Sequence, residues 1–228
     1  MARIRGWQRW LIVGVVVVAI LAVAGPYVYI HFIEGKAPKK LTLSQNTTPT
    51  NAGSSAANQP LDGAWKVGPG SQAGYRVKEI LFGQNNEAVG RTTAVTGNAA
   101  ITGTKVAAAD VTVDLTQVSS DQTRRDNQFH HRIMDTSTFP TATFKLTQPI
   151  DLPSTDGRVS AKANGDLTAH GVTKSAVADL QAERSGNGIR VSGSIPVTFA
   201  DYNIPNPSFG PVSTENHGLI EFLVVLTR

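Results

Sequence analysis

Apolar and polar residues alternate with a period of two through most of the sequence after residue 65. In the stretch VTVDL, the apolar residues Val111, Val113 and Leu115 are separated by polar ones. Successive side chains of a β-strand point to opposite faces, so this alternation predicts a strand with one wet face and one face against a core. The same pattern recurs at residues 142–147 and 189–199.

The spacing of these segments predicts a closed barrel. Most are separated by short turns that contain glycine, which is typical of antiparallel hairpins. One stretch, residues 123–134, has helical character, and Pro140 prevents its continuation. A parallel sheet would need a helix at every crossover, so we predict an all-β antiparallel barrel. The expected strands are residues 73–82, 88–101, 106–118, 142–147, 159–169, 174–182, 189–199 and 219–227.

A long apolar run precedes this domain. Residues 10–33 contain no Lys, Arg, Asp or Glu, and Arg3, Arg5 and Arg9 precede them. A run of this length predicts a membrane-spanning helix, and the basic flank predicts a cytoplasmic N-terminus. We therefore expect a single-pass protein of the cell membrane with an extracytoplasmic barrel. A signal peptide cleaved after Ala24 is the alternative.

The segment between the apolar run and the barrel is rich in Ser, Thr, Asn, Ala and Pro, which predicts a flexible linker. The expected order along the chain is a cytoplasmic N-terminus (residues 1–9), a transmembrane anchor (10–33), an extracytoplasmic linker (34–62) and a barrel domain (63–228). Residues 1–40 carry six Lys and Arg residues against one acidic residue, whereas the rest carries fifteen against sixteen. The barrel domain is therefore not basic, which argues against a nucleic-acid partner.

Several kinds of chemistry are excluded by what the sequence lacks. It contains no cysteine, so thiol nucleophiles, Cys-ligated zinc and iron–sulfur clusters are ruled out. The adjacent His130 and His131 would point about 100° apart on a helix, which makes them poor joint ligands for one metal. No phosphate-binding loop or nucleophile elbow occurs. We predict no metal, no cofactor and no enzymatic activity.

Small and aliphatic residues dominate the expected inward faces. An eight-stranded barrel can be filled by large side chains, or small ones can leave room for one ligand. Both a hollow barrel and a solid core are compatible with the alternation. For the hollow barrel, the candidate ligand-lining residues are Tyr75, Val77, Val111, Val113, Leu115, Phe144, Leu146, Val191, Ile195, Val197 and Phe199.

Three short motifs then follow in a fixed order: Arg125-Asp126, FPTATF at residues 139–144, and GDLTAHGVTK at residues 165–174. In this order and separation they resemble the YceI-like family of bacterial exported polyisoprenoid-binding proteins, over a region from about residue 65 to the end. The resemblance implies an eight-stranded, antiparallel, lipocalin-like barrel with a helix beside its mouth. It also implies a polyisoprenoid or similar long-chain amphiphile as the ligand.

The charged stretch around the expected helix has two interpretations. In the structural one, Arg125 and Asp126 fix the helix to the barrel rim through hydrogen bonds to loop backbone, Pro140 ends the helical region and Gly171 supplies a special backbone conformation in a hairpin. In the functional one, basic side chains at the mouth contact a phosphate or a quinone oxygen of the ligand. These candidate headgroup residues are Arg124, Arg125, His130, His131 and Arg132.

Two functions from different classes follow. The preferred hypothesis is a membrane-tethered binding protein that holds an isoprenoid quinone, a prenyl phosphate or a similar lipid, with the cytoplasmic membrane as its second partner. The alternative is a solid-cored adhesion or assembly domain that binds a protein through its outer surface. The last strand, residues 219–227, is apolar on both faces. Its outer face must therefore be covered by the helix or by a second subunit, which would make a homodimer.

Overall fold

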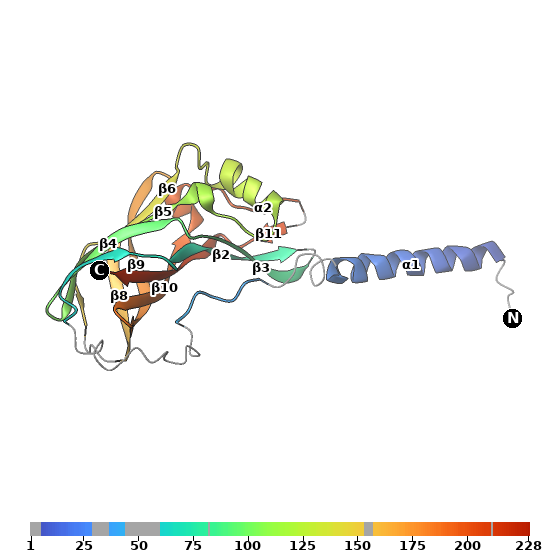
Figure 1. Cartoon of the computed structure of the whole chain (residues 1–228). Helices are drawn as coiled ribbons and strands as arrows, with labels where there is room; N and C mark the ends of the chain where they lie inside the picture. Colours follow the sequence, from blue (N-terminus) through green and yellow to red (C-terminus); the bar gives the residue numbers. More distant parts are fainter. Residues whose placement is uncertain (1–5, 29–36, 44–59, 82, 153–156, 211) are drawn as a thin grey trace.

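The computed structural model describes residues 6–28, 37–43, 60–81, 83–152, 157–210 and 212–228. The N-terminal helix α1 (Gly6–Val28) extends away from a β-barrel (Figure 1). The strands are β1 (Gly63–Val67), β2 (Gln72–Leu81), β3 (Gln84–Thr92), β4 (Val95–Thr102), β5 (Lys105–Asp114), β6 (Thr141–Leu146), β7 (Ile150–Asp151), β8 (Arg158–Ala169), β9 (Val172–Ser185), β10 (Gly188–Thr198), β11 (Val212–Thr214) and β12 (His217–Thr227).

All strand pairs are antiparallel, and they close on themselves. The ladder runs β1-β4-β5-β6-β8-β9-β10-β12, and β12 pairs back with β1 through Lys66–Thr227 and Val67–Leu226. β1 and β2 both pair with β12, one after the other, so together they act as one long bent strand. β3 and β4 form a second long bent strand beside it, because β3 pairs with β2 and β4 pairs with β1. The prediction of an eight-stranded antiparallel closed barrel is confirmed.

The bend between β1 and β2 is built by Gly68 to Ser71. Pro69 has no N–H to give to a ladder, and Gly70 has a φ of +88°, so the strand is interrupted here. Ser71 replaces the missing ladder bonds: its hydroxyl donates to Gly68 O at 2.7 Å and accepts from Val225 N at 2.9 Å. The two halves of the bent strand therefore stay attached to β12.

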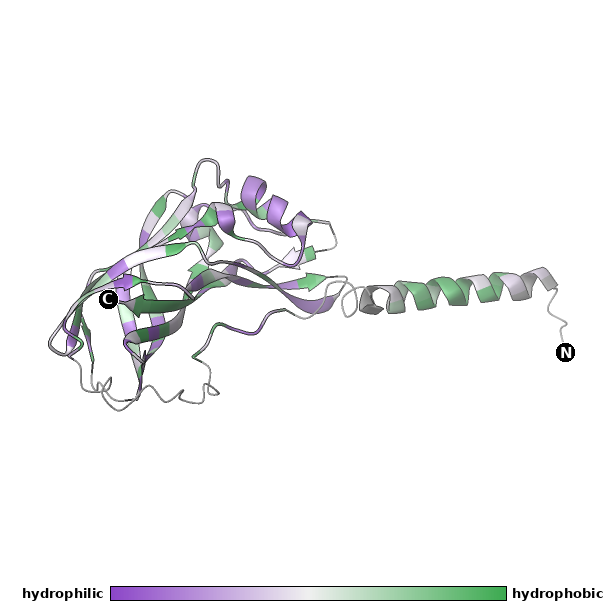
Figure 2. Ribbon diagram, viewed as in Figure 1, coloured by the Kyte–Doolittle hydropathy of each residue, from purple (hydrophilic) through white to green (hydrophobic). Residues whose placement is uncertain are grey.

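The helical segment lies where it was predicted, but only its first part is α-helical. α2 spans Thr123–Gln128 and continues as one π-helical turn, Phe129–Ile133. It is mostly hydrophilic (Figure 2). Phe129 and Met134 are buried beneath it against Leu115 and Val118, so its few apolar side chains attach it to the barrel.

The predicted single-pass membrane anchor is wrong. Within the described residues, no helix combines the length and apolar character needed to cross a membrane. The last five residues of the expected anchor, 29–33, lie outside the described residues, as do residues 34–36 and 44–59 of the expected linker.

A short segment from the expected linker packs on the outer wall of the barrel. We call residues 37–43 the strap; Leu43 is only 2% exposed. Beneath the strap, Glu221 of β12 bonds Arg76 at 3.1 Å and Arg91 at 2.6 Å. Both guanidinium groups also donate to strap carbonyls, those of Pro38 and Lys39. The strap thus covers part of the outer face of β12, for which the sequence suggested a helix or a second subunit.

The buried ion pairs under the strap give a testable difference. Glu221→Ala leaves two largely buried guanidinium groups without their shared carboxylate, and we expect it to lower the free energy of unfolding by about 3 to 5 kcal/mol. Asp179→Ala breaks an exposed pair with Lys162, so it should cost less than about 1 kcal/mol. Urea denaturation measures both; equal losses would contradict the buried network.

A second matched pair tests the β8–β9 hairpin. His170 and Gly171 have φ values of 48° and 74°, and a Cβ on Gly171 would lie 2.6 Å from the Phe139 ring. Gly186 has a similar φ of +58° but open space around it. Gly186→Ala should cost about 1 to 2 kcal/mol of backbone strain. Gly171→Ala should cost about 1 to 3 kcal/mol more, because Phe139 must move. Equal melting temperatures of the two variants would show that the Phe139 ring moves aside at little cost in free energy.

Candidate functional site: an elongated cavity inside the barrel

The barrel interior contains two adjoining cavities. The wide chamber has a volume of about 750 Å³ and lies at the end near α2 and β11, and the narrow chamber has about 210 Å³. Ala73, Val113, Ala142 and Ile220 line both chambers. Together they form one elongated hollow, and its wide part alone falls in the range of about 300 to 1,000 Å³ that is usual for ligand sites.

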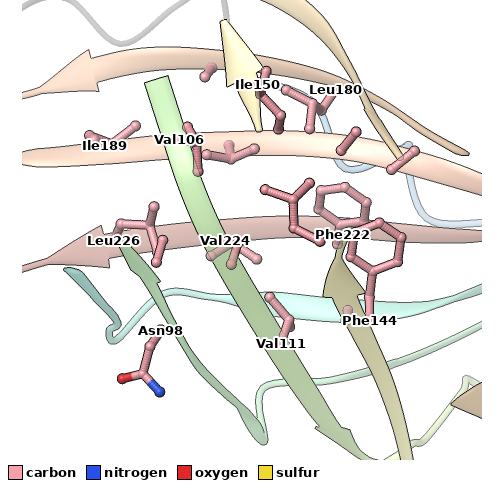
Figure 3. A pocket seen from close by; sticks show the side chains of 18 of the residues that line it. Asn98, Val106, Val111, Phe144, Ile150, Leu180, Ile189, Phe222, Val224 and Leu226 are labelled. Atoms are coloured by element: carbon pink, nitrogen blue, oxygen red, sulfur yellow. The ribbon is translucent and has the colours of Figure 1, made fainter. Parts of the chain in front are cut away.

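The narrow chamber is almost entirely apolar. Its walls come from β4, β5, β6, β8, β9, β10 and β12, and Figure 3 shows the side chains of Val111, Phe144 and Phe222 there. Asn98, Glu183 and Arg184 are the charged or amide side chains among its described lining residues. Such a space offers few hydrogen bonds, so it favours a hydrocarbon over any polar group.

The space is open because large rings lie against glycines of the neighbouring strands. A Cβ added to Gly90 would fall 2.4 Å from the Tyr75 ring, and one on Gly193 would fall 2.6 Å from that of Phe222. A Cβ added to Gly165 would fall 2.3 Å from the Phe144 ring. Each ring therefore lies against the wall, in the space that a side chain on the glycine would fill, and takes up less of the barrel interior.

The wide chamber is roofed by the helical segment. The ring of Phe129 stacks on that of Tyr75, with centroids 5.1 Å apart and planes 13° from parallel. Burial is the main reason that the pKa of the Tyr75 hydroxyl is raised far above its ordinary value, so this group stays protonated. Leu21, Ala22 and Gly25 of α1 also lie along this chamber.

The structure brings the predicted cavity residues together around this hollow. Val113 lines both chambers. The narrow chamber holds Val111, Phe144, Leu146, Val191 and Ile195, and the wide chamber holds Tyr75, Val77, Leu115, Val197 and Phe199. Their contact with a ligand stays a prediction.

Other lining residues escaped the sequence reasoning. Ile220, Phe222, Val224 and Leu226 of β12 point inward, but this strand is apolar on both faces and shows no alternation. Alanines such as Ala73 were missed because a small side chain gives little signal. Glu79 and Thr214 were missed because polar residues were assigned to the outside of the barrel.

The predicted mouth residues separate into two groups. Arg124 and Arg125 line the wide chamber. Arg125 pairs with Asp121 and lies 3.6 Å from Glu79. The guanidinium group of Arg124 is 5.5 Å from the centre of the exposed Phe209 ring.

His130, His131 and Arg132 are not among the described lining residues of either chamber. Nδ1 of His130 lies 3.3 Å from the Thr136 hydroxyl, and His131 is exposed. Arg132 donates to Pro207 O at 3.0 Å and also lies near the Phe209 ring, at 5.9 Å. His130 and Arg132 therefore contact other residues of the rim, and His131 is exposed on it.

Asp126 fixes the start of the helix. Its carboxylate accepts from Ser120 N at 2.8 Å and from the Ser120 hydroxyl at 2.6 Å, whereas the residue before the helix, Gln122, makes no side-chain cap. Pro140 links the other end to the barrel, because its carbonyl accepts from Leu115 N at 2.8 Å. The described residues contain no group of three or more His, Asp and Glu residues placed to hold a metal.

Comparison with known proteins agrees with this architecture. The model of the YceI-like domain matches residues 65–226. The chain belongs to the YceI-like family. UPF0312 protein VPA0850 of Vibrio parahaemolyticus is 32% identical over 103 residues, which cover 42% of this chain and 52% of that protein, about half its length.

Two solved structures share the YceI-like fold. A polyisoprenoid binding domain from Saccharophagus degradans superposes with a TM-score of 0.56 at 15% identity, over 72% of this chain and 97% of that one. BcnA of Burkholderia cenocepacia gives 0.52 at 19% identity, over 66% and 95%. At these identities the likeness establishes the fold alone.

The anchoring of the helix in this YceI-like domain can be tested at Asp126. Asp126→Ala removes two hydrogen bonds to an ionised acceptor and should lower the free energy of unfolding by about 1.5 to 3 kcal/mol. His131→Ala, on an exposed side chain of the same segment, should change it by less than about 0.5 kcal/mol. Thermal or urea unfolding measures both. A negligible effect of Asp126→Ala would show that burial of Phe129 alone holds the helix.

Proposed function

We propose that this protein binds a polyisoprenoid, or a similar long-chain lipid, inside its barrel and is not an enzyme. The observation that carries the proposal is the elongated hollow: a narrow apolar chamber that adjoins a wider chamber with polar groups along one side. This shape suits a hydrocarbon chain with a polar end. Membership of the YceI-like family and the structural likeness to a polyisoprenoid binding domain support the same ligand class.

Burial of the chain would supply the binding free energy. Each CH₂ group that leaves water contributes about 0.8 kcal/mol, so several isoprene units are enough for tight binding without any polar contact. The narrow chamber accepts the tail, because its lining offers mainly Val, Leu, Ile, Ala and Phe side chains. The wide chamber, roofed by Phe129, receives the head of the ligand and the first units of its chain.

The hollow interior argues against the solid-cored adhesion domain. That alternative needs inward side chains that fill the barrel, whereas here the rings of Tyr75, Phe144 and Phe222 lie over glycines. The proposal also assigns the predicted lining residues a shared role as a hydrophobic surface. None of them needs to act on the ligand chemically.

Blocking the junction of the two chambers tests the proposal. Val113→Trp places a large ring where both chambers meet, and we expect it to weaken uptake of a prenyl lipid at least about tenfold while the circular dichroism spectrum stays that of a folded β protein. Asp110→Trp, at an exposed position of the same strand, is the control and should bind as the unchanged protein does. Normal uptake by a folded Val113→Trp protein would place the ligand elsewhere and contradict the proposal.

A further inference from the structure

One buried hydroxyl group in the wall of the wide chamber has no hydrogen-bond partner. Among the described residues, the Oγ1 atom of Thr214 is the buried side-chain oxygen or nitrogen that makes no hydrogen bond, and Thr214 lines this chamber from β11. Buried polar groups are nearly always hydrogen-bonded, because leaving one unpaired costs free energy. The hydroxyl group is therefore a candidate partner for a polar atom of a ligand in this chamber.

A carboxylate lies directly opposite this hydroxyl group. Thr214 and Glu79 are partners in the β11–β2 ladder, and both line the wide chamber. The Glu79 side chain is only 10% exposed. Its Oε1 atom accepts from Asn86 at 2.8 Å and lies 3.6 Å from Arg125. A carboxylate has room for more than one hydrogen bond, so Glu79 can accept another from a ligand.

Tyr75 adds a second hydroxyl group to the same wall. It lies four residues before Glu79 on β2, and side chains at this spacing share one face of a strand. Its burial keeps the pKa of the phenol high, so the group remains a neutral donor or acceptor. Thr214, Glu79 and Tyr75 thus form a polar wall in a chamber that is otherwise mostly apolar.

The charges around this wall do not favour an anion. Arg125 lies 3.6 Å from Glu79 and is already paired with Asp121. The other arginine of the lining, Arg124, is exposed and lies over the Phe209 ring, so solvent and salt screen its charge. A phosphate group beside Thr214 would meet the Glu79 carboxylate, which repels it.

We propose that Thr214 and Glu79 form the headgroup subsite of the cavity, and that this subsite takes an uncharged, hydroxyl-bearing isoprenoid such as a polyprenol or a quinol. The ligand hydroxyl donates to the Glu79 carboxylate and accepts from the Thr214 hydroxyl, which satisfies both buried groups. A prenyl phosphate carries a negative charge that the Glu79 carboxylate repels, and a quinone carbonyl can only accept a hydrogen bond. This inference rests on the proposed function and specifies the ligand's head.

Three probes with one isoprenoid chain test the subsite: geranylgeraniol, its monophosphate, and the hydrocarbon without oxygen. Equilibrium dialysis of the full chain gives the dissociation constants. We expect the alcohol to bind at least about tenfold more tightly than the monophosphate. Equal binding of the alcohol and the phosphate, or tighter binding of the phosphate, would overturn the inference.

Two conservative variants locate the effect. Thr214→Val keeps the shape and removes the hydroxyl, so it should weaken binding of the alcohol by about five- to tenfold and leave the hydrocarbon unchanged. Glu79→Gln removes the charge and should tighten binding of the monophosphate at least about fivefold. Thr96→Val, at an exposed position of β4, is the control and should change nothing.

The outcomes separate this inference from the proposed function. If the unchanged protein binds the hydrocarbon and the alcohol equally, the cavity still holds isoprenoids but Thr214 and Glu79 do not recognise a headgroup. If Thr214→Val weakens the hydrocarbon as much as the alcohol, the residue has only a packing role and the subsite is wrong. If none of the three probes binds to the unchanged protein, the proposed function itself fails, and this inference with it.

Discussion

Aromatic rings that lie against glycines keep this barrel hollow. Tyr75, Phe144 and Phe222 each take the space that a side chain on Gly90, Gly165 or Gly193 would fill. A side chain at any of these glycines would force the ring to move, and in a closed barrel the only free direction is inward. The two chambers, and therefore the space for the proposed ligand, depend on this packing of rings against glycines. Close packing elsewhere in the wall makes the hollow a fixed feature and not a loose core.

Closure of the wall rests on two less regular features. The bend at Gly68 to Ser71 lets a single edge of β12 bind both β1 and β2, with the Ser71 hydroxyl in place of ladder bonds. On the outside, the strap is bound to Arg76 and Arg91. The charges of these two arginines are balanced by Glu221, which contacts both, and by Glu87, which pairs with Arg76. A buried network of this kind adds little net stability over an apolar one, but it fixes which chain segment lies on the wall.

Much of the barrel could be predicted from the sequence, because alternation reports directly which side chains face inward. Val111, Val113 and Leu115 illustrate this. The reasoning failed where a strand is apolar on both faces, as β12 is, and where polar residues point inward, as Glu79 and Thr214 do. Hydropathy alone could not place the N-terminal segment either: the apolar run predicted an anchor, whereas no helix of the described residues combines the length and apolar character of a membrane span. The partners of Glu221, Arg76 and Arg91, lie on strands that are far away in the chain, which no local pattern reveals.

The central claim, that the hollow barrel holds an isoprenoid lipid, can be tested most directly by native mass spectrometry. The intact chain would be purified under non-denaturing conditions from cells that produce it, and its mass compared with that of the denatured chain. The account predicts one extra species per chain, whose mass fits an isoprenoid series and whose fragment carries no phosphate. A folded protein that shows only the mass of the bare chain, and stays bare after incubation with prenyl lipids, would contradict it.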